Sequence, residues 1–420
     1  MMHLVRSGLL RNLGGIGDRR LYVHARTGTK QLIEDYHREV VRLIDAISRR
    51  SRPLSITARL EFLNETRLAY GGTALLLHGG ASLGICHLGV VKALADASLL
   101  PRYVSGANVG ALVAAMVGTH TDAELLACVR PRGVNLTAFR RRGTDGTVTR
   151  KIIRFLKHGY LLDVRVLEEL LRANVGEMTF EEAFRRTGRV LNITVATFRT
   201  NEIPRLLNYL TAPNVLVWSA ACASMAVTGL YDAVDLLAKD RKGNIRHWAP
   251  SAVLWRSSDA ADADADADAG AGVAVDDRGS LERRLAELFG VNHFLVSDCA
   301  TLRVSPLIQA LTHARHAATL GLSLGLGELR HLLLQLGRLG LMPRGVARAL
   351  AGVPHGQRHV VIAPTFGFVD YRTMFAHPTD ASLQEWTRKG ERSTWPHLSW
   401  IAARTTIEYA LDDAIARLHA

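Results

Sequence analysis

Two glycine-rich loops, about 25 residues apart, carry the residue types best suited to chemistry. The first, Gly79-Gly-Ala-Ser-Leu-Gly84, follows a short apolar run and precedes a helical pattern. In such a turn, backbone N–H groups and the positive end of the helix dipole point at one spot. This nest can hold a phosphate or the oxyanion formed when an ester is cleaved, and a tight turn needed only for packing is the alternative. The loop fits a dinucleotide fingerprint poorly, because Ala81 replaces the middle glycine and no acidic residue ends the next strand near position 104.

The second loop, Gly106-Ala107-Asn108-Val109-Gly110, follows the next candidate strand. Its glycines have the spacing of a nucleophile elbow, a strained strand-to-helix turn that lifts one side chain to the top of a sheet. We expect Gly106 and Gly110 to be required, because a Cβ at either position would collide with the neighbouring helix and strand. The central residue of that motif is serine, and this chain has Asn108 there. A carboxamide is not a competent acyl nucleophile near neutral pH.

The segments around these loops predict an α/β fold. Residues 73–77 and 102–104 are typical of buried strands, and each is followed by a glycine turn and a helical pattern. This order predicts a parallel sheet with crossover helices. Further strands are predicted at 190–196, at 234–238 with 244–248 as a hairpin, at 291–297 and at 360–363. Further helices are predicted at 30–48, 57–70, 164–174 and 399–418, and a capping box, Thr179-Phe-Glu-Glu182, opens another.

Composition excludes several classes of protein. With 48% hydrophobic and 22% charged residues, the chain is globular with a large core. Its four cysteines are far apart and lack the spacing of a zinc site, so we expect free thiols in a reducing compartment, no metal and no cofactor. Residues 71–91, 103–121 and 206–231 lack charge, but glycine and polar residues interrupt them, which favours a buried core over membrane spans. The Asp-Ala tract at 258–272 has nothing large to bury and predicts a disordered loop.

The formal net charge is +13, which favours anionic surfaces unless it reflects only an Arg-rich composition. Aromatic residues make up 6% of the chain and no nucleic-acid module is recognisable, so we expect no nucleic-acid partner. Phospholipid headgroups are the anionic surface that the charge favours instead. The first 26 residues are too rich in arginine to form the apolar core of a signal peptide.

A set of further motifs covers nearly the whole chain. They are Asn64-Glu-Thr-Arg67, His87-Leu-Gly-Val-Val-Lys-Ala-Leu94, Thr119-His-Thr-Asp122, Leu207-Asn-Tyr-Leu-Thr-Ala-Pro-Asn214, Leu236-Leu-Ala-Lys239, Leu285-Ala-Glu-Leu-Phe289 with Val291-Asn-His-Phe294, and Gly390-Glu-Arg392 with Trp395-Pro396. In this order they resemble the patatin-like phospholipases, specifically the eukaryotic triacylglycerol-lipase branch that acts on lipid droplets. The N-terminal region, including Leu13-Gly-Gly-Ile16, resembles the extra domain that precedes patatin in this branch, which accounts for the basic start without a targeting peptide.

The resemblance implies a Ser–Asp dyad, in which the elbow serine attacks the ester carbonyl and an Asp of an Asp-Gly pair acts as its base. It places the oxyanion hole in the first loop, at Gly79, Gly80, Ala81 and Gly84. Asn108 stands at the nucleophile position. The Asp-Gly pair is matched only loosely, by Asp277-Arg278-Gly279 or by Asp276.

Other residues near the loops also depart from the pattern that the resemblance implies. Thr228 replaces a usual proline before Gly229, and His78 replaces a usual serine. Ser105 and Ser82 are the nearby hydroxyls, and we expect neither to be presented by the elbow. The resemblance requires no histidine, so His87 and His293 are expected to be buried and hydrogen-bonded.

The sequence therefore predicts an α/β patatin-like parallel sheet flanked by helices. The expected parts are a helical N-terminal region at 1–70, a core at 71–300 containing the 258–272 insert, and a helical C-terminal extension at 301–420 packed on the core. The predicted function is that of a catalytically impaired lipase relative, cytoplasmic and peripheral on a lipid droplet or membrane. It would bind acylglycerol or phospholipid, or regulate an active homologue. The alternative is an active triacylglycerol lipase or acyltransferase with an unusual nucleophile.

Overall fold

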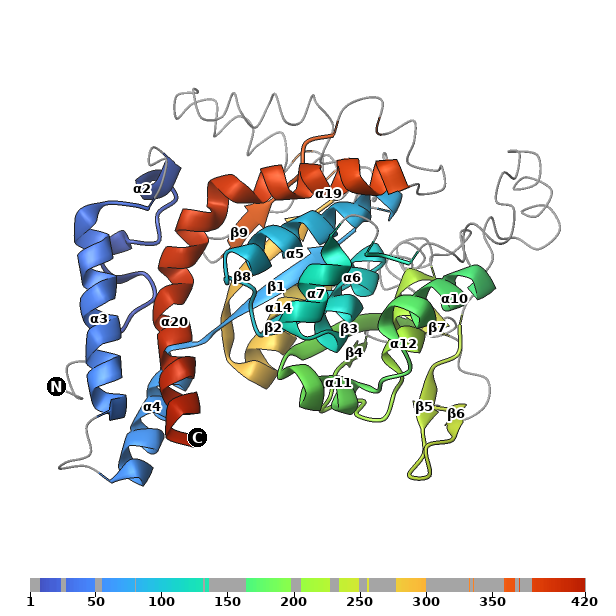
Figure 1. Cartoon of the computed structure of the whole chain (residues 1–420), viewed down its shortest axis with the longest axis horizontal. Coiled ribbons are helices and arrows are strands. Elements are labelled where there is room, and N and C mark those ends of the chain that lie inside the picture. Colours follow the sequence, from blue (N-terminus) through green and yellow to red (C-terminus); the bar gives the residue numbers. More distant parts are fainter. Residues whose placement is uncertain are drawn as a thin grey trace.

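The computed structural model describes residues 8–23, 28–49, 55–79, 81–130, 133–135, 164–197, 205–226, 234–248, 255–256, 277–299, 332, 335, 359–366, 370 and 380–419. Within these residues a seven-stranded sheet forms the centre of the molecule, with helices on both of its faces (Figure 1). The predicted α/β class is confirmed. The Asp-Ala tract at 258–272 lies outside the described residues.

The sheet is mostly parallel. Its strands are β1 (Gly72–His78), β2 (Tyr103–Gly106), β3 (Val190–Thr197), β4 (Arg205–Leu207), β7 (Trp255–Arg256), β8 (Val291–Asp298) and β9 (His359–Ile362). The order β3-β2-β1-β8-β9 is parallel throughout, and β4 and β7 pair antiparallel with β3. The predicted hairpin forms from β5 (Leu237–Lys239) and β6 (Ile245–His247).

The central strand explains why the sequence shows continuous apolar runs rather than alternation. All seven residues of β1 are buried, because helices cover both faces of the parallel sheet. Leu75 and Leu77 pack into the larger core, whereas Ala74 and Leu76 pack against the helix that precedes β8. Strand β2 runs two residues beyond its predicted end at 104, because pairing with β1 continues through Gly106.

The helices of the core follow the crossover pattern. They are η2 (Ala81–Ile85), α5 (Cys86–Asp96), α6 (Val109–Thr119), α7 (Asp122–Val129), α10 (Val164–Val175), α11 (Phe180–Thr187), α12 (Val217–Met225), α14 (Asp277–Phe289) and α19 (Asp380–Thr394). The capping box of α11 is confirmed, since the Glu182 N–H donates to Thr179 Oγ1 at 3.2 Å and the Thr179 N–H donates to Glu182 Oε2 at 2.8 Å.

The two ends of the chain pack together in a helical layer beside the sheet (Figure 1). This layer contains η1 (Leu13–Gly15), α2 (Arg20–Val23), α3 (Gln31–Arg49), α4 (Ile56–Tyr70), η3 (Trp395–His397) and α20 (Leu398–His419). Ile44 of α3, Leu63 of α4 and Leu411 of α20 share one buried cluster. The division of the chain at 70 and 300 stays a prediction; β9, from the segment after 300, contributes to the central sheet.

The cysteines are free thiols, and Cys86, Cys222 and Cys299 are buried. Among the described helices, none is long and apolar enough to cross a membrane. The charge-free stretch at 71–91 instead forms β1, η2 and the first half of α5.

Candidate active site

The second glycine loop forms a strained turn between β2 and α6. Asn108 is the N-cap residue of α6 and has φ 54° and ψ −129°, a backbone conformation that is costly for a residue with a Cβ. The surroundings hold it in place: the Ala107 N–H donates to the Leu77 carbonyl at 3.1 Å, and the Asn108 N–H donates to Ser224 Oγ at 3.2 Å. The turn has the backbone strain that a nucleophile elbow requires.

The glycines on either side of Asn108 are required by close packing, as predicted. A Cβ on Gly110 would lie 2.1 Å from the Leu77 carbonyl oxygen, and a Cβ on Gly106 would lie 2.4 Å from the Gly110 carbonyl oxygen. Both contacts are with backbone atoms, which cannot move aside cheaply. Asn108 is thereby brought to the carboxyl edge of the sheet with 8% of its surface exposed.

The first glycine loop lies beside this turn. Gly79 follows β1 with φ 73°, and η2 begins two residues later. A Cβ on Gly84 would lie 2.8 Å from the Val109 Cβ and 2.9 Å from the Gly79 carbonyl oxygen, so the loop packs directly on the first residue of α6. Gly80 and the side chain of Ala81 lie outside the described residues, and the oxyanion hole stays a prediction.

Asp277 is the first residue of α14, and its side chain and all of Asp276 lie outside the described residues. Helix α14 ends where β8 begins and packs on the strand through Leu281 and Leu285, so the two run in opposite directions. Because the strand ends at the carboxyl edge, the helix begins toward that same edge. Contact between Asp277 and Asn108 stays a prediction.

Two polar side chains that end neighbouring strands were not assigned roles from the sequence. His78 of β1 and Asp298 of β8 are register partners and lie 8% and 3% exposed at the carboxyl edge. Both are on the sheet face that α14 covers, as are Leu76 and Val296 two residues earlier. Asp298 directly follows the predicted strand 291–297, which was a usable signal. The sequence held no such signal for Ser224 of α12, because only folding brings this residue to Asn108.

Among the other hydroxyls and histidines, Ser105, His87 and His293 are buried. Ser105 is 1% exposed, and its buried Oγ has no hydrogen bond within the described residues, so the elbow does not present it. The side chain of Ser82 is outside those residues, as are Thr228 and Gly229. His87 Nδ1 lies 2.7 Å from Ser297 Oγ, and His293 Nδ1 lies 3.2 Å from Thr73 Oγ1, so the prediction for both is confirmed.

Comparison with known proteins agrees with this geometry. Residues 75–249 match the patatin-like phospholipase family, and residues 1–68 match a family described as a domain of unknown function (DUF3336). Triacylglycerol lipase ptl1 of Schizosaccharomyces pombe is 31% identical over 98% of this chain and 72% of its own length. The chain belongs to the patatin-like phospholipase family. The resemblance seen in the motifs is therefore confirmed. The expected extra domain before the patatin region is confirmed as well, by the match of residues 1–68.

Two other relatives are longer than this chain. Triacylglycerol lipase SDP1L of Arabidopsis thaliana is 37% identical over 99% of this chain and 51% of its own length. Triacylglycerol lipase 5 of Saccharomyces cerevisiae is 31% identical over the whole chain and 57% of its own length. This chain therefore spans about half the length of both relatives.

Proposed function

We propose that this patatin-like protein is catalytically impaired in ester hydrolysis and acts by binding acylglycerol or phospholipid at a membrane or lipid-droplet surface, or by regulating an active homologue. The observation that carries the proposal is Asn108. It occupies the strained turn between β2 and α6 where the family resemblance places serine, and its carboxamide cannot form an acyl-enzyme by simple deprotonation. The relatives' names supply the substrate class.

The rest of the site supports a retained scaffold. The two glycine loops pack on each other, and the positive φ of Gly79 is compatible with backbone N–H groups facing an oxyanion. If Asp277 reaches the site, only the nucleophile is missing. An unusual nucleophile is the alternative, and the burial of Ser105 argues against the nearest candidate.

The test compares the protein with Asn108→Ser and Asn108→Ala on a short-chain and a long-chain acylglycerol. We expect no hydrolysis by the unmodified protein or by Asn108→Ala, and measurable hydrolysis by Asn108→Ser. A missing nucleophile leaves only what the oxyanion hole and binding supply, so the gain should be several orders of magnitude in rate.

Each other outcome of that assay has a definite meaning. If Asn108→Ser does not hydrolyse either acylglycerol, a second defect lies at the Asp position and lipid binding remains as the function. Clear hydrolysis by the unmodified protein that survives Asn108→Ala would refute impairment, and its loss in Ser105→Ala would identify the substitute.

A corner of the helical layer supports contact with a lipid surface. Leu10, Leu13 and Trp395 are 60%, 36% and 54% exposed. The loop after η1 lies against the start of α20, because Trp400 Nε1 donates to the Gly17 carbonyl at 2.9 Å. Arg19 acts electrostatically on His397 of η3 and adds positive charge at this corner. Tryptophan and basic residues are both typical of segments that lie at a lipid headgroup boundary.

A further inference from the structure

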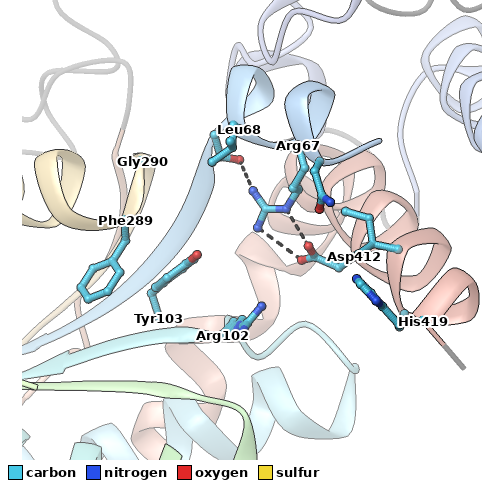
Figure 2. A pocket seen from close by; sticks show the side chains of 12 residues that line it. Arg67, Leu68, Arg102, Tyr103, Phe289, Gly290, Asp412 and His419 are labelled. Atoms are coloured by element: carbon cyan, nitrogen blue, oxygen red, sulfur yellow. Dashed lines mark hydrogen bonds and ion pairs between the residues drawn. The ribbon is translucent and has the colours of Figure 1, made fainter. Parts of the chain in front are cut away.

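Figure 2 shows a hollow of about 400 Å³. Its lining includes the first residue of β2 and the residue before β8, so it lies at the amino edge of the sheet, whereas the elbow follows the carboxyl end of β2. The hollow is formed where α4, the first residue of β2, the end of α14 and the end of α20 meet. The seven residues of β1 separate it from the first glycine loop by about 20 Å, at about 3.3 Å per residue. Its volume is within the range of about 300–1,000 Å³ typical of small-molecule sites. It is therefore a separate cavity from the candidate active site.

The two arginines in the hollow differ in how many of their N–H donors already have a protein partner. Arg67 donates to both carboxylate oxygens of Asp412, at 2.7 and 3.2 Å, and to the Gly71 carbonyl and Glu408. Arg67 and Asp412 thus form a closed pair in the wall. Arg102 donates through Nε to the Gly188 carbonyl at 3.0 Å, and its guanidinium lies 6.0 Å from the centre of the Phe184 ring. Within the described residues its two terminal NH₂ groups donate no hydrogen bond, so of the two arginines in the lining it is the one with donors left for a ligand.

A neutral donor stands next to Arg102. Tyr103 directs its hydroxyl toward the Arg67–Asp412 pair (Figure 2), and that hydroxyl has no hydrogen-bond partner in the described part of the chain. Burial raises the pKa of Tyr103 and outweighs the lowering effect of Arg67 and Arg102, so the hydroxyl stays protonated and can donate. Arg102 and Tyr103 together present unused N–H and O–H donors to the same space.

The other part of the lining is apolar. Leu68 of the lining is 73% exposed, and Phe289 and Ile415 of the lining are half-buried. Removing this apolar surface from water on contact with an apolar stem would be favourable. A ligand that matches both parts has one anionic group and an apolar stem.

We propose that this hollow binds a single-chain amphiphile with an anionic head, with Arg102 and Tyr103 on the head and Leu68, Phe289 and Ile415 along the chain. A fatty-acid carboxylate and an alkyl phosphate share this chemistry. The inference does not depend on Asn108 or on any hydrolysis, so it can be supported or refuted independently of the proposed function.

The test is calorimetric titration of the full chain with laurate, dodecyl phosphate and dodecanol, each below its aggregation concentration. We expect both anions to bind, and dodecanol to bind at least about tenfold more weakly, because a charge-assisted hydrogen bond is lost. Tighter binding of laurate would identify a fatty acid as the natural source, and tighter binding of dodecyl phosphate would identify a phospholipid product. No binding of either anion, or equal binding of dodecanol, would overturn the proposal.

Variants locate the binding. Arg102→Gln should lower the affinity for both anions about tenfold. Ala416→Trp changes an exposed lining residue of α20 and should fill the hollow and abolish binding. The matched control is Arg241→Gln, an exposed arginine in the turn of the β5–β6 hairpin, which should bind as the unmodified protein does. All three changes are at exposed residues, and thermal unfolding checks that each variant is folded. Unchanged affinity in both Arg102→Gln and Ala416→Trp would place the ligand elsewhere and refute the site.

Discussion

Glu408 joins three parts of the molecule through one buried carboxylate. Its side chain is 3% exposed and accepts hydrogen bonds from Arg11 Nη2 at 3.1 Å, from Arg67 Nη2 at 2.9 Å and from the Thr73 N–H at 2.9 Å. Arg11 also stacks over the Tyr70 ring at 4.6 Å. The N-terminal region, the C-terminal helix and the central strand therefore depend on the same negative charge.

Neutralising this carboxylate should be strongly destabilising. Glu408→Gln leaves two largely buried guanidinium groups without their shared anion, and we expect the free energy of unfolding to fall by about 3–5 kcal/mol in a urea titration. Glu385→Gln is the control, because Glu385 is 63% exposed and its pairing with Lys389 should contribute less than about 1 kcal/mol. Equal losses in the two variants would show that Glu408 does not have this role.

At the scale of elements, η1 and η3 give the lipid proposal its clearest test. Both are short, and the hydrogen bond from Trp400 Nε1 to the Gly17 carbonyl holds the loop after η1 against the start of α20, which follows η3. Leu13 of η1 keeps 36% of its surface exposed and Trp395 of η3 keeps 54%. A lipid surface would cover them.

Flotation with anionic vesicles checks this contact. Replacing Leu13 and Trp395 together by alanine should lower vesicle binding about tenfold or more, because the two side chains lose their apolar transfer energy. Leu210→Ala removes a leucine that is 53% exposed elsewhere and should leave binding unchanged. Binding that is indifferent to the double substitution, or to the presence of anionic lipid, would contradict the proposed surface.

The whole molecule should lose stability in acid through His397, which is half-buried, and His293, which is fully buried. Burial, reinforced by Arg19, lowers the pKa of His397 to about 4, and burial also lowers the pKa of His293 well below its usual value. The unfolded chain binds protons near pH 6.5, whereas these folded histidines resist protonation. Their contribution is therefore fully present above pH 6.5 and is lost as the pH falls toward 4.

Urea unfolding at pH 7.5 and pH 5 measures this loss. His397→Asn should reduce the difference between the two free energies of unfolding by on the order of 1 kcal/mol, because asparagine does not titrate. His247→Asn serves as the control, since 67% of the His247 side chain is exposed. A loss of the same size in His397→Asn and in the unmodified protein would exclude His397 as a source of acid sensitivity.

The buried strands, the glycine loops and the capping box of α11 could be predicted from the sequence, because each depends on residues close together in the chain. The family could be predicted for the same reason, from short motifs in a fixed order. Strands β4 and β7 are only three and two residues long and were not predicted, since they carry no periodic pattern of their own. Identifying the turn at Asn108 needed only the spacing of Gly106 and Gly110.

The sequence by itself therefore determined the class of fold, the strained turn and the residue that stands in it. Tertiary structure alone decided that Ser224 meets Asn108, that His78 and Asp298 lie side by side, and that Arg102 opens onto a hollow with Phe289. The physical reason is that local periodicity encodes which face of an element is buried. The partner of that face depends on strand order and helix packing over hundreds of residues, and no short pattern records it.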